Sequence, residues 1–254
     1  ERYDRNGLTY VRNASWLYGT SGMDFYISIY NDNIDKFHNE VSLRTDPYSY
    51  CYEGLNERSE LEALLGVNHY FVNEGSSEKP YGYDTLEYTT ETHDADGNYY
   101  NISSYTSDRN NSLFYLFDKS ISSEEFEKLD VIERQQALLQ GVVVEENANS
   151  KVKDLELDDD SVDFVVSGCD GLSYDTESGM ITVNNAGAVM YLTYSDLSDS
   201  ELYLYFDNID YEHDEDSAYI ISCQAYNGQD ALAGVNSSYS GNNDKHHMYG
   251  GKHN

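Results

Sequence analysis

A short helix followed by a strand is predicted by the stretch Asn56-Glu-Arg-Ser-Glu-Leu-Glu-Ala-Leu-Leu-Gly66-Val-Asn-His-Tyr-Phe-Val72. Gly66 ends the helix, because glycine readily takes the backbone conformation that closes a helix C-terminus. The run from Asn68 to Val72 is rich in aromatic and β-branched residues, which favours a strand. Helices and strands are therefore expected to mix in the first half of the chain.

Upstream of this unit, residues 21–37 predict one helix that begins at Ser21. Its apolar residues recur at steps of three and four, the spacing of one buried helix face. They are Met23, Ile27, Tyr30, Ile34 and Phe37.

Downstream, residues 87–92 and 98–105 predict two strands joined by a turn at 93–97 that contains Asp96-Gly97, a strong hairpin signal. Ser122-Ser-Glu-Glu125 predicts a capping box, and Asp130-Val-Ile-Glu133 predicts a second helix start. Gly141 ends that helical stretch, and a strand is expected over 141–145.

The chain changes character near residue 150, where short strand candidates separated by turn residues replace the helices. These candidates are 162–167, 180–184, 188–193, 201–208 and 219–225. Their spacing is typical of a β-sandwich or jelly roll. We therefore predict an α+β protein with a mixed α/β domain over 1–149 and an all-β, jelly-roll-like sandwich over 150–254, truncated at its C-terminal end.

The composition limits the possible partners. The 254 residues include 15 Lys and Arg against 47 Asp and Glu, a formal net charge of −32. A field of this sign repels phosphate backbones, so we expect no nucleic-acid partner. The 26 tyrosines suit both β-strands and sugar faces, since tyrosine has an apolar ring and a polar tip.

Catalytic, metal and cysteine signals are weak. The sequence contains no nucleophile elbow, zinc-protease motif or phosphate-binding loop. In Asp94-Ala-Asp96-Gly97 the glycine stands too early for an EF-hand, and the acidic runs at 158–160 and 212–216 are typical of solvated surface. We expect no metal and no cofactor. Cys51, Cys169 and Cys223 are odd in number, so isolated buried thiols are favoured, with a Cys169–Cys223 bridge as the alternative.

A family resemblance extends over most of the chain. Trp16-Leu-Tyr-Gly19, Leu43-Arg-Thr-Asp-Pro-Tyr48, Glu60-Leu-Glu-Ala-Leu-Leu-Gly66 and Lys79-Pro-Tyr-Gly-Tyr83 follow one another in an order that resembles the extracellular part of YfhO-type bacterial membrane proteins. Ser112-Leu-Phe-Tyr-Leu-Phe-Asp118, Glu133-Arg-Gln-Gln-Ala-Leu-Leu-Gln-Gly141 and Leu202-Tyr-Leu-Tyr-Phe-Asp-Asn-Ile-Asp-Tyr211 are similar to the same family.

The resemblance implies a multi-spanning glycosyltransferase of the lipid-sugar-dependent type. Such a protein would add sugars to envelope polymers such as lipoteichoic acid, from a polyprenyl-phosphate sugar, at the extracellular face of the membrane. The chain would be an extracellular piece of it, inactive alone because the catalytic acid is expected outside it. Its implied partners are an envelope glycopolymer or lipid-linked sugar and its own transmembrane domain. The alternative is a secreted or surface-anchored carbohydrate-binding module.

One set of residues is a candidate for substrate binding, since arginine binds anions and tyrosine can stack on a sugar ring. Its members are Trp16, Tyr18, Arg44, Asp46, Arg58, Tyr81 and Tyr83. The competing interpretation is structural, with Arg44 and Arg58 forming ion pairs with Asp46 or Glu60 that fasten the first domain together.

Overall fold

The computed structural model describes residues 2–6, 15, 19–26, 31–41, 43, 45–46, 51–74, 79–93, 96–107, 109, 112, 114–145, 155–157, 162–195, 200–206, 209–210, 221, 226–227, 230–231 and 246–253. The chain forms two compact units. Unit 1 comprises Glu1–Asp158 with Glu201–Lys252, and unit 2 comprises Asp159–Ser200 with His253–Asn254. The boundary near residue 150 that the sequence suggests stays a prediction.

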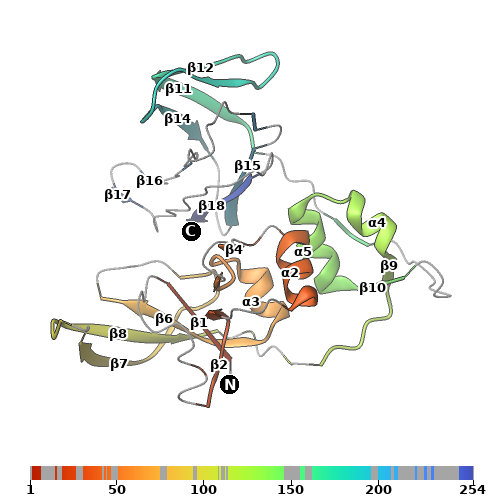
Figure 1. The fold of residues 1–254 in the computed structure, drawn as a ribbon, viewed down its shortest axis with the longest axis vertical. Coiled ribbons are helices and arrows are strands. Elements are labelled where there is room, and N and C mark those ends of the chain that lie inside the picture. The colour runs from red at the N-terminus through yellow and green to blue at the C-terminus, as the bar shows by residue number, and fades with distance from the viewer. Residues whose placement is uncertain are drawn as a thin grey trace. The chain divides into compact units, whose positions relative to one another are not determined.

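A mixed five-stranded sheet is the centre of unit 1 (Figure 1). Its order is β2-β1-β6-β8-β7, with β1 parallel to both of its neighbours and β8 antiparallel to both of its own. The strands are β1 (Arg2–Asn6), β2 (Ser21–Gly22), β6 (Val67–Asn73), β7 (Thr85–His93) and β8 (Tyr99–Thr106). The predicted hairpin is thus confirmed as β7 and β8, with Gly97 at φ +84° in the turn.

The helices of unit 1 gather beside this sheet (Figure 1). They are α2 (Asp32–Glu40), α3 (Ser59–Leu64), α4 (Ser123–Lys128) and α5 (Val131–Gln140). The short α3 contacts both β6 and α5, so it joins the sheet to the helices. The predicted unit of helix, Gly66 and strand is confirmed, since Gly66 has φ +65° between α3 and β6.

The start of α5 follows the sequence signal closely. Asp130 and Glu133 form a complete capping box, in which each side chain accepts from the other residue's backbone N–H at 2.8 Å. At α4, the Ser122 hydroxyl accepts from the backbone N–H of Glu125 at 3.2 Å. Gly141 then caps α5 before the predicted strand, which is observed as β10 (Val142–Val144).

Arg134 on α5 ties three helices together. Its guanidinium donates to the carbonyl oxygens of Glu40 at 2.7 Å, Phe126 at 3.2 Å and Glu127 at 2.7 Å. These carbonyls lie at the C-terminal ends of α2 and α4, where helices leave acceptors unpaired and favour a positive charge.

Two apolar clusters fill unit 1. The larger lies between the sheet, α3 and the end of α2, and contains Val41, Leu43, Leu55, Leu61, Val67, Tyr70, Val72 and Tyr83. The smaller contains Ile121, Phe126 and Ala137. Leu138 of α5 packs against both clusters and so makes them continuous.

The described residues of unit 1 also form several small sheets. A three-stranded antiparallel sheet has the order β3-β5-β4, and three further sheets pair two strands each. The strands are β3 (Asp24–Tyr26), β4 (Thr45–Asp46), β5 (Cys51–Glu53), β9 (Ser120–Ser122) with β10, β15 (Ser200–Phe206) with β18 (His246–His253), and β16 (Tyr226–Asn227) with β17 (Asp230–Ala231).

Unit 2 consists of two antiparallel strand pairs among its described residues. β11 (Phe164–Asp170) pairs with β14 (Val189–Tyr194), and β12 (Leu172–Tyr174) pairs with β13 (Ile181–Val183). The strands expected near 162–167, 180–184 and 188–193 are therefore present, and β12 is an additional one. The candidate at 219–225 lies almost entirely outside the described residues.

The predicted sandwich or jelly roll is not seen in the described residues. Neighbouring side chains on a strand point to opposite faces, yet Phe164 is 47% exposed and Val165 is 68% exposed. Side chains of β14 alternate between exposed and half-buried, and no residue of β11 or β14 is fully buried, whereas a sandwich buries one face of each sheet. Regular strand spacing located these strands, but it does not specify whether a second sheet covers them.

The single helix predicted over 21–37 is wrong in its first part. Residues 21–22 and 24–26 are strands, and the helix begins only at Asp32, after its N-cap Asn31. Phe25 pairs with Tyr52 across β3 and β5, with ring centroids 4.6 Å apart. A distant strand partner thus overrides the local helical spacing.

The cysteine expectation also needs correction. Cys169 is a free thiol on β11 and is exposed, rather than buried or bridged to Cys223. Cys223 lies outside the described residues.

Gly54→Ala tests how tightly the turn before α3 packs. Gly54 has φ +71°, and an added Cβ would lie 2.5 Å from Oδ1 of the buried Asp4. We expect a loss of about 3 kcal/mol in the free energy of unfolding, from left-handed backbone strain together with overpacking. Urea unfolding of both proteins measures the loss.

Gly97→Ala is the matched control. Gly97 has φ +84°, but nothing lies within 4 Å of its added Cβ. Only the backbone strain remains, so the expected loss is about 1 kcal/mol. Equal losses in the two variants would contradict close packing of Gly54 on Asp4.

Candidate functional site

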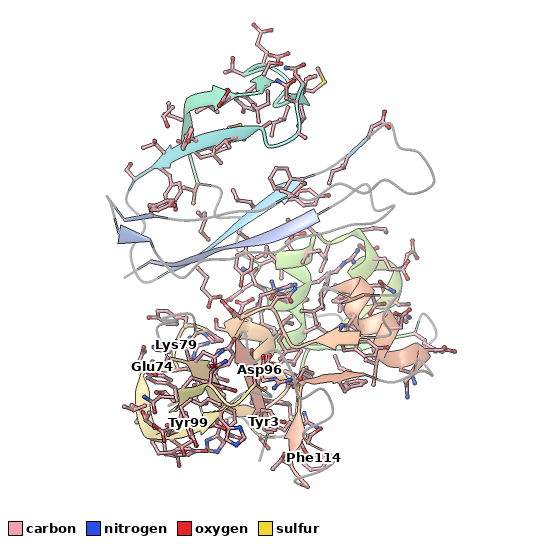
Figure 2. All side chains as sticks on the ribbon, turned by 60° about the vertical axis from the view of Figure 1, so that its left-hand side comes forward. Tyr3, Glu74, Lys79, Asp96, Tyr99 and Phe114 are labelled. Carbon is pink, nitrogen blue, oxygen red and sulfur yellow. The ribbon has the colours of Figure 1, made fainter. Side chains whose placement is uncertain are left out.

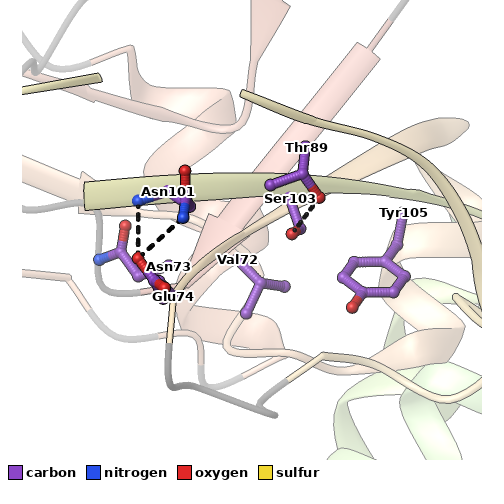
Figure 3. Close-up of a pocket in the computed structure, with 7 residues that line it drawn as sticks. All are labelled: Val72, Asn73, Glu74, Thr89, Asn101, Ser103 and Tyr105. Atoms are coloured by element: carbon purple, nitrogen blue, oxygen red, sulfur yellow. Dashed lines mark hydrogen bonds between the residues drawn. The ribbon is translucent and has the colours of Figure 1, made fainter. Parts of the chain in front are cut away.

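A polar pocket lies on the β6–β8–β7 part of the large sheet (Figure 3). Its volume is about 270 Å³. The lining residues share polar or aromatic chemistry apart from one valine, and are Val72, Asn73, Glu74, Thr89, Asn101, Ser103 and Tyr105.

Strand register explains why most of these residues meet. Val72, Ser103 and Thr89 stand opposite one another across the three strands. Alternate residues of a strand share a face, so Asn101, Ser103 and Tyr105 of β8 lie on the same side. The pocket is therefore built mainly on one face of the sheet, with the buried Val72 at its base.

Hydrogen bonds hold the lining side chains in place. Glu74 Oε2 accepts from both the backbone N–H and the side-chain amide of Asn101, each at 3.1 Å (Figure 3). The hydroxyls of Thr89 and Ser103 are 2.9 Å apart and hydrogen-bonded. At the other end, the Lys79 ammonium lies 5.1 Å from the centre of the Tyr105 ring. Carboxylate, amide, hydroxyl and aromatic groups thus face one small space.

The candidate residues predicted from the sequence do not line this pocket where the structure describes them. Trp16, Tyr18 and Arg44 lie outside the described residues, and Asp46 belongs to β4, where its backbone pairs with Cys51. The other three are Arg58, Tyr81 and Tyr83, which lie in or beside the core of unit 1.

Arg58 is an interior residue, only 3% exposed. Its Nε donates to Gln135 Oε1 at 2.9 Å and its Nη1 to the carbonyl oxygen of Val41 at 2.5 Å. Burial lowers the pKa of Arg58 to about 10, although the negative charge of Glu60 acts to raise it. Its hydrogen bonds in the described structure therefore go to neutral groups that join the end of α2 to α5, and a role in substrate binding stays a prediction.

Tyr81 and Tyr83 differ in exposure. Tyr81 is half-buried, its backbone N–H donates to Glu201 Oε1 at 3.2 Å, and the Arg109 guanidinium lies 5.5 Å from its ring centre. Tyr83 is buried and donates its hydroxyl to the carbonyl oxygen of Val67 at 2.8 Å. Burial raises the pKa of Tyr83 well above its usual value, and the nearby charges of Glu62 and Asp4 act in the same direction.

Asp4 of β1 and Glu62 of α3 form a buried acid pair. Asp4 is 2% exposed and Glu62 is 0% exposed. Asp4 accepts from the backbone N–H groups of Leu55 at 2.8 Å and Arg5 at 2.9 Å. Burial raises the pKa of Asp4 to about 6 in spite of these bonds. Burial also raises the pKa of Glu62 well above its usual value, helped by the charge of Asp4 and a hydrogen bond to it.

A shared proton accounts for this pair. Neither oxygen of an ionised Glu62 finds a donor among the described residues. A protonated Glu62 can donate to Asp4, which removes one buried charge and satisfies one buried polar group. The folded chain therefore holds a proton on this pair up to a higher pH than the unfolded chain does.

Sequence reasoning missed both the pocket and the acid pair. The alternation of Asn101, Ser103 and Tyr105 was a usable signal for a polar face on β8. Nothing in the sequence around Asp4 signals its pairing with Glu62, because 58 positions separate the two residues. Among the described residues, no group of three His, Cys, Asp or Glu side chains is placed to hold a metal ion.

The acid pair predicts how stability depends on pH. The pKa of Asp4 rises from 3.8 to about 6 on folding. Its contribution to the free energy of unfolding is therefore complete below pH 3.8 and is lost as the pH rises through 6. That rise corresponds to about 3 kcal/mol. His38 acts oppositely: burial lowers its pKa from 6.5 to about 4, so its contribution is lost as the pH falls from 6.5 towards 4.

Glu62→Gln should stabilise the chain at pH 8 and gain less at pH 5. A glutamine amide donates to Asp4 without needing a proton, so the variant avoids the cost that the native pair meets as the pH rises. Urea unfolding at both pH values measures the difference. Glu127→Gln removes a carboxylate from the exposed side of α4, outside the buried pair, and is the control against which the change for Glu62→Gln is compared. A gain for Glu62→Gln that does not grow with pH would refute the shared proton.

The family model described as "Bacterial membrane protein YfhO" matches residues 2–240. No curated protein and no solved structure matches significantly. Within the described residues, no helix combines the length and apolar character that a membrane crossing requires. Because the family model covers nearly the whole sequence, the chain belongs to the YfhO family of bacterial membrane proteins.

Proposed function

We propose that this chain is the extracellular region of a multi-spanning membrane protein that glycosylates cell-envelope polymers such as lipoteichoic acid. The sugar donor is a polyprenyl-phosphate sugar, and the transfer takes place at residues outside this chain. The observation that carries the proposal is the family match over residues 2–240. In this role the chain positions the acceptor polymer beside the membrane-embedded part of the protein.

Two features of the chain support this role. The pocket on β6–β8–β7 offers amide, hydroxyl and carboxylate groups, which are suited to hydrogen bonding with sugar hydroxyls. Phe114 is 90% exposed (Figure 2), and Leu116 is 103% exposed. Between them, the Tyr115 hydroxyl donates a 2.9 Å hydrogen bond to the carbonyl oxygen of Ala63. A contact with another part of the protein or with a membrane would cover these apolar side chains.

The direct test uses cells that make the whole protein. Deleting its gene should remove the sugar substituent from the envelope polymer, and the complete protein should restore it. A version that lacks residues 2–240 should reach the membrane but fail to restore the sugar. Mass spectrometry of the purified polymer gives the readout. Unchanged glycosylation in the deletion strain would contradict the proposal.

The isolated chain provides a second test. Incubated with a radiolabelled polyprenyl-phosphate sugar and the polymer, the 254-residue chain should transfer no label. Transfer by the chain alone would overturn its non-catalytic role. A carbohydrate-binding module, the alternative, would bind polymer in the same way but leave glycosylation intact when its gene is deleted.

A further inference from the structure

We propose that the pocket on β6, β7 and β8 binds one neutral pyranose ring of a saccharide. Nothing in the family match assigns a ligand or a residue to this surface. That this saccharide is a sugar of the envelope polymer rests on the proposed function.

The size of the pocket favours a single ring. Its volume of about 270 Å³ lies just below the range of about 300–1,000 Å³ that is usual for pockets of drug-sized ligands. A chain of several sugars would therefore place one ring in the pocket and leave the others in solvent. Such a site binds one sugar unit of a polymer and does not enclose the others.

The hydrogen-bonding groups match a polyhydroxylated ligand. Sugar hydroxyls both donate and accept, and the pocket supplies both functions at fixed positions. Glu74 Oε2 is occupied by Asn101, which orients the carboxylate, while the Thr89 and Ser103 hydroxyls are held 2.9 Å apart. Because these groups are already held by one another, little side-chain freedom is lost when a ligand binds.

Charge selects against anionic ligands. The charged residue in the lining is Glu74, and the whole chain carries −32. The ammonium of Lys79 lies on the Tyr105 ring and bonds to Asp84 Oδ1 at 3.0 Å, so a carboxylate already compensates it. A phosphate or uronate would meet net repulsion here, whereas a neutral sugar would not.

Neighbouring threonines of β7 give a matched test. Thr89 lines the pocket and Thr90 points to the opposite face of the same exposed strand. We would titrate the 254-residue chain with methyl β-glucopyranoside and follow backbone amide shifts by NMR. For one ring we expect a dissociation constant on the order of 1 mM. Thr89→Ala should weaken binding roughly fivefold to tenfold, and Thr90→Ala should leave it unchanged.

A second variant and a second ligand extend this test. Ser103→Leu fills the centre of the pocket and should abolish saturable binding, while a thermal unfolding midpoint shows that the variant is folded. Glucuronate, the anionic counterpart of the probe, should bind at least tenfold more weakly than the glucoside. No saturable binding by the native chain, equal losses for Thr89→Ala and Thr90→Ala, or equal affinity for glucuronate would each overturn the site.

Failure of the site and failure of the proposed function are distinguishable. If deletion of the gene removes the polymer's sugar but the chain does not bind the glucoside, the site is wrong and the function stands. If the chain binds the glucoside through Thr89 but the deletion leaves glycosylation intact, the sugar site stands and the envelope role is wrong.

Discussion

The burial of Asp4 against the turn before α3 is the constraint on which unit 1 depends. Its carboxylate accepts from the backbone of Leu55, and Gly54 approaches so closely that no side chain fits there. This contact fixes β1 to the start of α3, and Glu62 on α3 then lies beside the same carboxylate. Since two ionised carboxylates cannot share a dry site cheaply, the fold holds a proton at this point up to a higher pH than the unfolded chain does.

The same sheet face serves two purposes along its length. Asp4 stands opposite Tyr70, and Tyr70 stands opposite Tyr105, so these side chains share the face that covers the core. Further along β8 this face carries Ser103 and Asn101 and becomes the polar pocket. The core thus supports the pocket directly, and a side chain such as Val72 belongs to both.

Local signals predicted the elements whose cause is local. The β7–β8 hairpin follows from Asp96-Gly97 flanked by strand-forming residues, and α5 follows from its capping box. The helix expected over 21–37 failed because β3 takes its partner from β5, some 25 residues away. The sandwich failed in the described residues for a related reason: strand spacing says nothing about which face another sheet covers.

By itself the sequence determined the helix–strand unit at 56–72, the hairpin, the N-caps of α4 and α5, the strongly acidic composition and membership of the YfhO family. Each depends on residues close in the chain, on overall composition or on an ordered series of short motifs. The tertiary structure alone decided the Asp4–Glu62 pair, the interior position of Arg58 and the pocket across three strands. Those features require side chains far apart in sequence to share a buried or enclosed space, which strand register and packing establish only when the chain has folded.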